Sequence, residues 1–162
     1  MTVDNKVTSD DRLNIERNDE GYSRAIAAFA VAEGGVVAPF TARETLDHPT
    51  YLTVQTAPGT HILLAPEYLQ YINHSCDPNV FFDTDRMEIR ALRAIAPGDE
   101  VTFFYPSTEW SMDRAFECHC GAAGCLGQIA GADSLDAAVL VRYRFNRHIL
   151  DRLGERAQAE PA

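Results

Sequence analysis

Three cysteines stand within one short glycine-rich segment, and their spacing restricts the fold more than any other feature of the sequence. Glycines around Cys118, Cys120 and Cys125 let the backbone bend tightly enough for three thiolates to converge on one ion. A structural zinc ion takes four ligands in a tetrahedron, by preference sulfur or imidazole. The candidates for the fourth ligand are His119, which lies between two ligands and would point away, and Cys76, the remaining cysteine. The spacing alone leaves this choice open.

The four cysteines would also allow two disulfides, so the cellular compartment matters. The first 20 residues lack the basic start and apolar block of a secretory signal, and we therefore expect a cytoplasmic protein whose thiols stay reduced. No stretch approaches the roughly 18 apolar residues of a membrane helix. Fourteen Lys+Arg against 24 Asp+Glu give a net charge of -10, which argues against a DNA- or RNA-binding module. The charge favours a cationic small molecule or a basic peptide as the ligand.

Short alternating runs dominate the 162 residues, a length that suits one domain. Residues 1–20 are acidic and poor in large apolar groups, and we expect them to form a flexible arm. The segment 24–32 fits neither a helical nor a strand period. Bulky β-formers between turn residues predict strands over 51–56, 61–64, 80–82, 87–92 and 100–105. One helical turn is expected over 66–71, so the body is mainly β.

The C-terminal segment is the one part with a helical period. Leucine, valine and tyrosine side chains from Leu135 to Leu153 fall on one stripe, Asp133 or Ser134 can cap the start, and Gly154 follows the end. We therefore expect one helix. A second face of this helix is formed by Leu140, Phe145 and Ile149. Two interpretations stay open: the helix packs on the body, or this second face meets another subunit.

Three motifs follow one another at compatible spacing and together resemble a known family. Residues 73–79 read Asn-His-Ser-Cys-Asp-Pro-Asn, residues 98–105 read Gly-Asp-Glu-Val-Thr-Phe-Phe-Tyr, and residues 118–127 hold the cysteine and glycine pattern. This series resembles the SET-domain family of protein lysine methyltransferases, including its post-SET zinc segment. The similarity is specific over residues 61–130.

The resemblance implies a fold and a division of the chain. The fold would be mainly β (α+β): a SET-domain β-clip of short strands with a threaded pseudoknot, a post-SET zinc loop and a C-terminal helix. After the arm, the SET domain would span 21–117, the post-SET segment 118–131, and the helix and tail 132–162. In the family the cysteine of the Asn-His-Ser-Cys motif joins the three post-SET cysteines on one zinc ion. The resemblance thus implies Cys76, Cys118, Cys120 and Cys125 as the ligands of a structural Zn²⁺.

The resemblance also implies S-adenosyl-L-methionine as the cofactor. Asn73 and His74 would bind it, largely through backbone groups of their loop. The turn formed by Gly21, Tyr22 and Ser23 would occupy the place of the family's Gly-x-Gly turn, from which it departs at the last position. Phe116 would pack near the adenine.

On the acceptor side, the resemblance implies a lysine of a basic protein or peptide as substrate. Tyr105 would be the catalytic tyrosine where the two pockets meet, and Tyr51 and Phe103 would line the lysine channel. Phe103 leaves more room than a tyrosine, which favours di- or trimethylation. Phe104 departs from the family, many members of which carry Asp before the catalytic tyrosine.

Two other functions remain. The chain is small enough to be a SET-like enzyme that acts on a small-molecule amine or amino acid. It would alternatively be a zinc-stabilised module that binds the cofactor or a peptide without turnover. The full Asn73-His74 pair and Tyr105 argue against the module.

Overall fold

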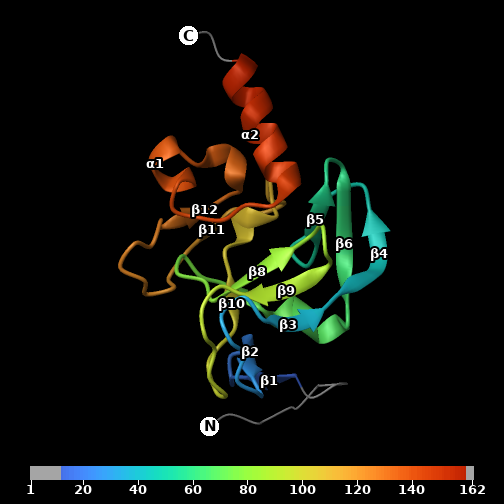
Figure 1. Ribbon diagram of the computed structural model, residues 1–162, viewed down its shortest axis with the longest axis vertical. Helices are drawn as coiled ribbons and strands as arrows, with labels where there is room; N and C mark the ends of the chain where they lie inside the picture. The colour runs from blue at the N-terminus through green and yellow to red at the C-terminus, as the bar shows by residue number, and fades with distance from the viewer. Residues whose placement is uncertain (1–11, 160–162) are drawn as a thin grey trace.

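Short strands in small sheets are the main regular structure of the computed structural model, which describes residues 12–159 (Figure 1). The antiparallel hairpin β1 (Leu13–Arg17) with β2 (Ser23–Ala27) begins the described part. One three-stranded sheet has the order β3 (Val36–Pro39), β9 (Glu88–Ala91), β8 (Val80–Asp83). The other has the order β4 (Thr41–Leu46), β6 (Thr60–Ala65), β5 (Val54–Ala57).

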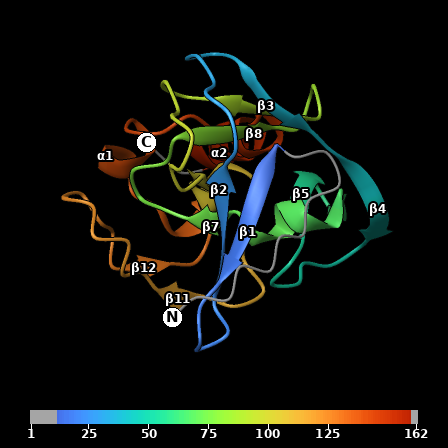
Figure 2. The ribbon, with the colours of Figure 1, turned by 90° about the horizontal axis from the view of Figure 1, so that it is seen from below.

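Two pairs of two-residue strands complete the sheets of residues 12–159. β7 (Asn73–His74) pairs in parallel with β10 (Thr102–Phe103), which brings two distant motifs side by side. β11 (Phe116–Glu117) pairs with β12 (Gln128–Ile129) and closes the cysteine segment into a loop. Seen from below, β1 and β2 lie beside β7 (Figure 2). The helical elements are η1 (Glu67–Tyr71), η2 (Tyr105–Ser107), η3 (Ala132–Ser134), α1 (Ala137–Leu140) and α2 (Arg147–Ala159).

One large apolar cluster holds the sheets together. It takes in the first hairpin through Leu13, both three-stranded sheets, and the strand β10 through Phe103. Phe82 lies at its centre, fully buried, with its ring 5.5 Å from Phe40 and 4.2 Å from Phe103 (centroid distances). The core therefore reaches directly to the segment that ends in Tyr105. The mainly β class, the strand pairs β5–β6 and β8–β9, and the turn η1 are confirmed.

The predicted flexible arm over residues 1–20 is wrong for Leu13–Arg17. These residues form β1, paired in register with β2, and Leu13 and Ile15 are buried. Their alternation with polar residues is that of an edge strand. The pairing also assigns the ambiguous segment 24–32 to a strand in its first part. Residues 1–11 of the predicted arm lie outside the described residues.

The prediction of a single C-terminal helix is also wrong, because residues 132–159 form η3, α1 and α2 with a break between α1 and α2. The buried side chain of Asn146 lies in this break; its Nδ2 donates to the carbonyls of Phe82 (2.7 Å) and Ser107 (3.0 Å). Asp136, rather than Asp133 or Ser134, caps α1, and Gly154 lies inside α2. The backbone N–H of Asn146 donates to the Ser107 carbonyl at 3.0 Å instead of to a helical carbonyl, and the Asn146 carbonyl accepts from the N–H groups of Ile149 and Leu150. The helical ladder is therefore interrupted before Asn146 and begins again there.

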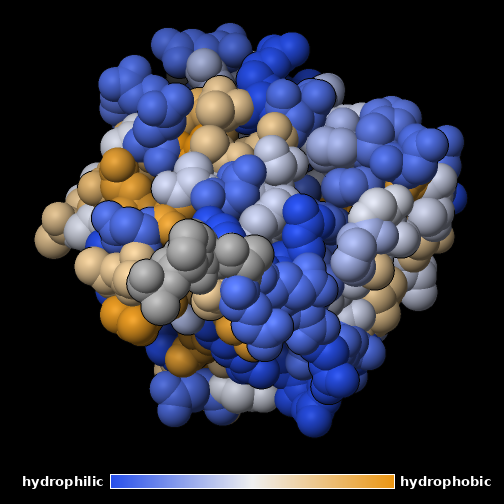
Figure 3. Space-filling view, turned by 90° about the horizontal axis from the view of Figure 1, so that it is seen from above, coloured by the Kyte–Doolittle hydropathy of each residue, from blue (hydrophilic) through white to orange (hydrophobic). Residues whose placement is uncertain are grey.

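The burial of the C-terminal segment decides between its two interpretations. Phe145 and Ile149 are 7% and 0% exposed and pack in a second cluster around Phe104, so they are not a free face for another subunit. Val141 and Leu150 are instead exposed. Seen from above, apolar residues gather toward the side on which α1 lies (Figure 3). Among residues 12–159, none of the helices has the length and apolar composition needed to cross a membrane.

Candidate active site and cysteine centre

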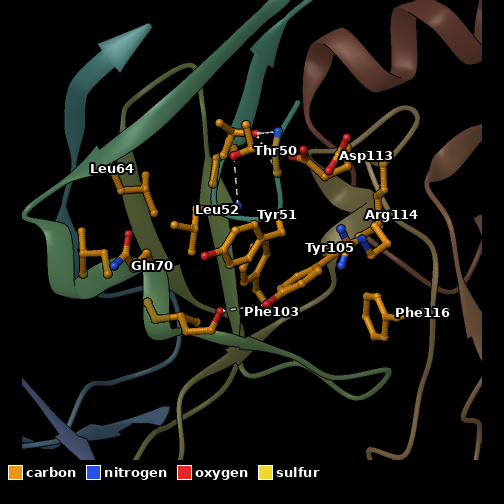
Figure 4. Close-up of a pocket in the computed structure, with 16 residues that line it drawn as sticks. Thr50, Tyr51, Leu52, Leu64, Gln70, Phe103, Tyr105, Asp113, Arg114 and Phe116 are labelled. Atoms are coloured by element: carbon orange, nitrogen blue, oxygen red, sulfur yellow. Dashed lines mark hydrogen bonds between the residues drawn. The ribbon is translucent and has the colours of Figure 1, made fainter. Parts of the chain in front are cut away.

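A cavity of about 400 Å³ opens beside Tyr105 (Figure 4). Tyr51, Phe103 and Tyr105, the three residues predicted for the acceptor channel, all line it, and their rings converge in its centre. Tyr51 is 81% exposed and Phe103 6%, so the cavity runs from the surface to the core. Its other apolar walls are Leu52, Val54, Leu64, Leu69, Ile72, Met112 and Phe116. Such a narrow apolar space suits an unbranched aliphatic chain.

Two hydrogen bonds fix Tyr105 in the wall of this cavity. Its backbone N–H donates to His74 Nδ1 at 3.1 Å, and its hydroxyl donates to the carbonyl of Ile72 at 3.4 Å. Burial, with the nearby charge of Glu109, raises the pKa of Tyr105 well above its usual range. The hydroxyl therefore stays protonated at neutral pH and is available to orient a polar group.

The side chain of His74 packs among aromatic rings and lines neither the Tyr105 cavity nor the polar hollow described below. Its ring packs against Phe104, Tyr105 and Phe116, with centroids 5.2–5.6 Å apart. Burial lowers the pKa of His74 to about 4, so the ring is neutral at pH 7. Because Nδ1 accepts from Tyr105, the proton resides on Nε2, which lies 3.4 Å from Cys76 Sγ. His74 thus connects the tyrosine to the cysteines.

A second, polar hollow of about 310 Å³ collects three of the residues predicted for the cofactor. Tyr22, Ser23 and Asn73 line it, and Asn73 Nδ2 donates to the Ser23 carbonyl at 2.8 Å. Gly21 begins this turn at φ +88°, a conformation that disfavours other residues. The remaining lining residues are Glu16, Asn18, Arg24 and Glu100. Phe116, predicted near the adenine, lines the Tyr105 cavity.

The strand β7 separates the two spaces. Ile72, directly before it, lines the Tyr105 cavity, and Asn73, its first residue, lines the polar hollow. β10 pairs with β7 and leads into Tyr105, so the parallel pair fixes the tyrosine relative to both spaces. The arrangement is that of two binding spaces that share one thin wall.

The four cysteines come together beside this pair of strands. Their sulfur atoms all lie within 4.8 Å of one another, and Cys76 Sγ is 3.9 Å from Cys118 Sγ. A tetrahedral zinc ion with bonds of about 2.3 Å separates two sulfurs by about 3.8 Å, so the donor set fits such an ion. His119 is exposed and lies outside this group. The backbone N–H of Leu126 donates to Cys76 Sγ at 3.4 Å, an arrangement that stabilises a thiolate.

The contacts of Phe104 and the burial of Glu109 were not predicted from the sequence. Phe104 stacks on Tyr143 with centroids 3.6 Å apart, and so the apolar departure from the family holds the C-terminal segment. Glu109 is a buried carboxylate in the wall of the Tyr105 cavity. Its position in Thr108-Glu109-Trp110 shows no periodicity, and a single acidic residue there is indistinguishable from a surface residue.

Comparisons with known proteins agree with this geometry. The sequence profile of the SET domain matches residues 6–106. Methyltransferase flvH of Aspergillus flavus is 44% identical over 131 residues, which are 80% of this chain and 73% of flvH. The H3 lysine-36 specific histone-lysine N-methyltransferase of Saccharomyces cerevisiae is 30% identical over 113 residues, 66% of this chain and 15% of that enzyme.

Among solved structures, a complex of KRYPTONITE with mCHH DNA, an H3(1-15) peptide and SAH has a similar fold. The TM-score is 0.55 at 24% identity, over 72% of this chain and 29% of that one. The chain therefore spans a small part of the yeast enzyme and of KRYPTONITE, and most of flvH.

Proposed function

Because the chain belongs to the SET-domain family, we propose that it transfers methyl groups from S-adenosyl-L-methionine to the ε-amino group of a lysine in a protein. The observation that supports this most strongly is the position of Tyr105. It lies in the wall of a deep apolar cavity, directly across the strand β7 from a polar hollow. Methyl transfer needs the amine and the methyl donor in line at one point, so the proposal requires that the two spaces connect beside Tyr105 when the cofactor is bound.

The polar hollow fits the amino-acid end of the cofactor. Arg24 pairs with Glu16 at 2.8 Å and lies 3.9 Å from Glu100, so its guanidinium would have to exchange one of these partners to bind the carboxylate. Asn73 retains its Oδ1 as an acceptor for the ammonium group while Nδ2 binds Ser23. The bound cofactor supplies a methyl group on a positively charged sulfur. Gly21, Tyr22, Ser23 and Asn73 would hold it, with His74 ordering the wall between donor and acceptor.

On the acceptor side, the residues of the chain orient and desolvate the amine. A free lysine has a pKa of about 10.4, and the apolar walls around Phe103 favour its neutral form. The protonated hydroxyl of Tyr105 and the carbonyl of Ile72 provide polar atoms at the meeting point. The ring of Phe103 lies 4.7 Å from that of Tyr105 and has no hydroxyl to bind a methylated amine, which supports di- or trimethylation.

We propose that the four cysteines bind a structural zinc ion. The ion would join Cys76, which lies two residues after β7, to the loop of Cys118, Cys120 and Cys125. Phe116 and Met112, just before that loop, line the acceptor cavity. The metal would therefore close the site without taking part in the reaction.

One comparison favours a second acceptor. The chain covers 73% of flvH, which bears the general name of a methyltransferase, and only 15% of the yeast histone-lysine enzyme. A small-molecule amine is therefore the alternative acceptor.

Methyl-labelled cofactor tests the proposal. The full chain is incubated with basic peptides and, separately, with free lysine and small diamines, followed by mass spectrometry. We expect label on peptide lysine, and Tyr105→Phe should lower kcat about 100-fold while cofactor affinity is kept. Tyr71→Phe is the control, because Tyr71 packs on the core outside both cavities.

The outcomes separate the candidates. Label on small amines alone supports the second acceptor. Cofactor binding without transfer to any amine contradicts both and supports a binding module.

A further inference from the structure

Glu109 is held rigidly in the wall of the Tyr105 cavity. It is 6% exposed, and its Oε2 accepts hydrogen bonds from the Gln55 N–H (2.9 Å) and the Thr108 hydroxyl (2.6 Å). Its own backbone N–H donates to the Tyr105 carbonyl at 3.0 Å. The side chain of Gln55 in turn accepts from the Trp110 N–H at 2.9 Å. These bonds connect β5 to the segment after Tyr105 and leave the carboxylate little freedom.

The second carboxylate oxygen, Oε1, has no hydrogen-bond partner among residues 12–159. Among the described residues, two side-chain oxygens are fully buried and have no hydrogen-bond partner, Gln70 Oε1 and Ser107 Oγ. Glu109 Oε1 is not one of them. Oε1 therefore keeps access to open space, and the cavity that Glu109 lines is the Tyr105 cavity. One oxygen is used by the protein and the other is free for a ligand.

The negative charge of Glu109 has no structural use. Burial raises its pKa to about 7, which means that ionisation opposes folding. A glutamine would accept the same two hydrogen bonds through its amide oxygen without this cost. No Lys or Arg forms an ion pair with Glu109 in the described part of the chain. A buried carboxylate without a partner either takes up a proton or binds a cation, and the cavity is where such a cation would come from.

We propose that Glu109 is the residue that recognises the positive charge of the acceptor. The ligand class is a primary alkylammonium on an unbranched aliphatic stem, either a lysine side chain or a small diamine. The stem would pack along the apolar walls, such as Leu52 and Phe103, while Oε1 of Glu109 binds the ammonium group on its way to Tyr105. The inference rests on the proposed function for the role of the cavity, and its test does not depend on turnover.

The groups around Glu109 allow its ionisation to be followed through the pH dependence of cation binding. The other titratable groups that share its cavity or pack on its bonding partners are Tyr51, Tyr105, Asp113, Arg114 and His148. Burial raises the pKa of Tyr105 and lowers that of His148, so both stay neutral above pH 7. Tyr51, Asp113 and Arg114 are exposed on the rim of the cavity. A change of cation affinity near pH 7 would therefore report on Glu109.

Binding of n-butylammonium, measured by calorimetry or NMR on the full zinc-loaded chain, tests the proposal. The ligand stays charged from pH 5.5 to pH 8.5, because amine pKa values are about 10.4. We expect its affinity to rise with pH as Glu109 ionises. Glu109→Gln should weaken binding at pH 8 about 30-fold or more and remove the pH dependence. Neutral 1-butanol should bind both proteins equally.

Asp83→Asn is the matched control. Asp83 is also a buried carboxylate, 9% exposed, but it accepts from the N–H groups of Asp85 and Arg86 and lies outside the cavity. Its substitution should leave n-butylammonium affinity unchanged.

Equal n-butylammonium affinity in wild type and Glu109→Gln, with the thermal transition intact, overturns the proposal. So does a wild-type affinity that is constant from pH 5.5 to pH 8.5, a result that needs no variant. If the wild type binds the cation through Glu109 but methylates no amine, the proposed function fails and this inference stands. If it methylates amines and Glu109→Gln changes neither affinity nor KM, the reverse holds.

Discussion

The sheets around Tyr105 and the segment after it line the same cavity but are held together differently. The sheets share one continuous buried cluster and long backbone ladders, as in β4–β6 and β8–β9. The cysteine segment has a two-residue ladder, β11–β12, and a small cluster in which Ile129 is the one buried residue besides cysteines. Each region supplies part of the cavity wall, Phe103 from the first and Phe116 from the second.

This difference means that the two halves of the site have separate sources of stability. Burial of apolar area holds the half formed by the sheets at any metal concentration. The other half depends on four sulfurs and a few side chains. We expect the cofactor and acceptor pockets to open or close with the state of the cysteine segment, while the sheets stay folded.

Removal of zinc should separate the two regions most strongly. Structural zinc contributes on the order of 10 kcal/mol to small zinc domains, and the cysteine segment has little else. Chelation should make residues 112–130 exchange their amide hydrogens freely, whereas β8 and β9 keep their protection in hydrogen-exchange mass spectrometry. Cys125→Ser should have the same effect without chelator. Purified protein that contains no zinc, or exchange that chelation leaves unchanged, would contradict the zinc centre.

Phe104→Ala should loosen the C-terminal segment next most strongly. Phe104 is 2% exposed and stacks on Tyr143, so its removal should cost about 3–5 kcal/mol. The loss should appear first as faster exchange in α2. Phe40→Ala is the comparison in the sheets, where a similar cost should lower the global free energy of unfolding instead. Equal effects of the two variants on every region would show that the molecule unfolds as one unit.

Ser23→Gly should have the smallest effect. Asn73 binds the backbone carbonyl of Ser23, and the Ser23 hydroxyl only accepts from Arg17 on the surface. Restoring the family's glycine should therefore change the affinity for S-adenosylhomocysteine, measured by calorimetry, by no more than about 3-fold. A tenfold change would mean that the hydroxyl itself contacts the cofactor.

The parts of the fold that could be predicted are those in which neighbouring residues determine the structure. The alternating runs around Val54, Ile62 and Phe82 gave their strands, because each buries one face. β4 was missed because Thr41–Leu46 is almost wholly exposed and pairs with β6 through its backbone alone. The first strand was missed because its few apolar residues lie in an acidic stretch.

The site shows the same limit. The cysteine spacing predicted three ligands, and Cys76 followed from the resemblance, since it lies 42 positions from Cys118 in the sequence. Neither the break at Asn146 nor the burial of Glu109 has a local pattern, because each residue binds a backbone group of a strand more than 50 positions away in sequence, Phe82 and Gln55 respectively. The cytoplasmic location and the individual site roles stay predictions.

The pairing of β7 with β10 also has a consequence for synthesis on the ribosome. Tyr105 binds His74 across 31 positions of sequence, and Tyr143 binds the carbonyl of Cys76 across 67. At roughly 5–20 residues per second, the loop of Asn73 leaves the ribosome several seconds before its last partner. A nascent or truncated chain that ends before Tyr143 would therefore contain every predicted catalytic and cofactor residue and still have no finished site.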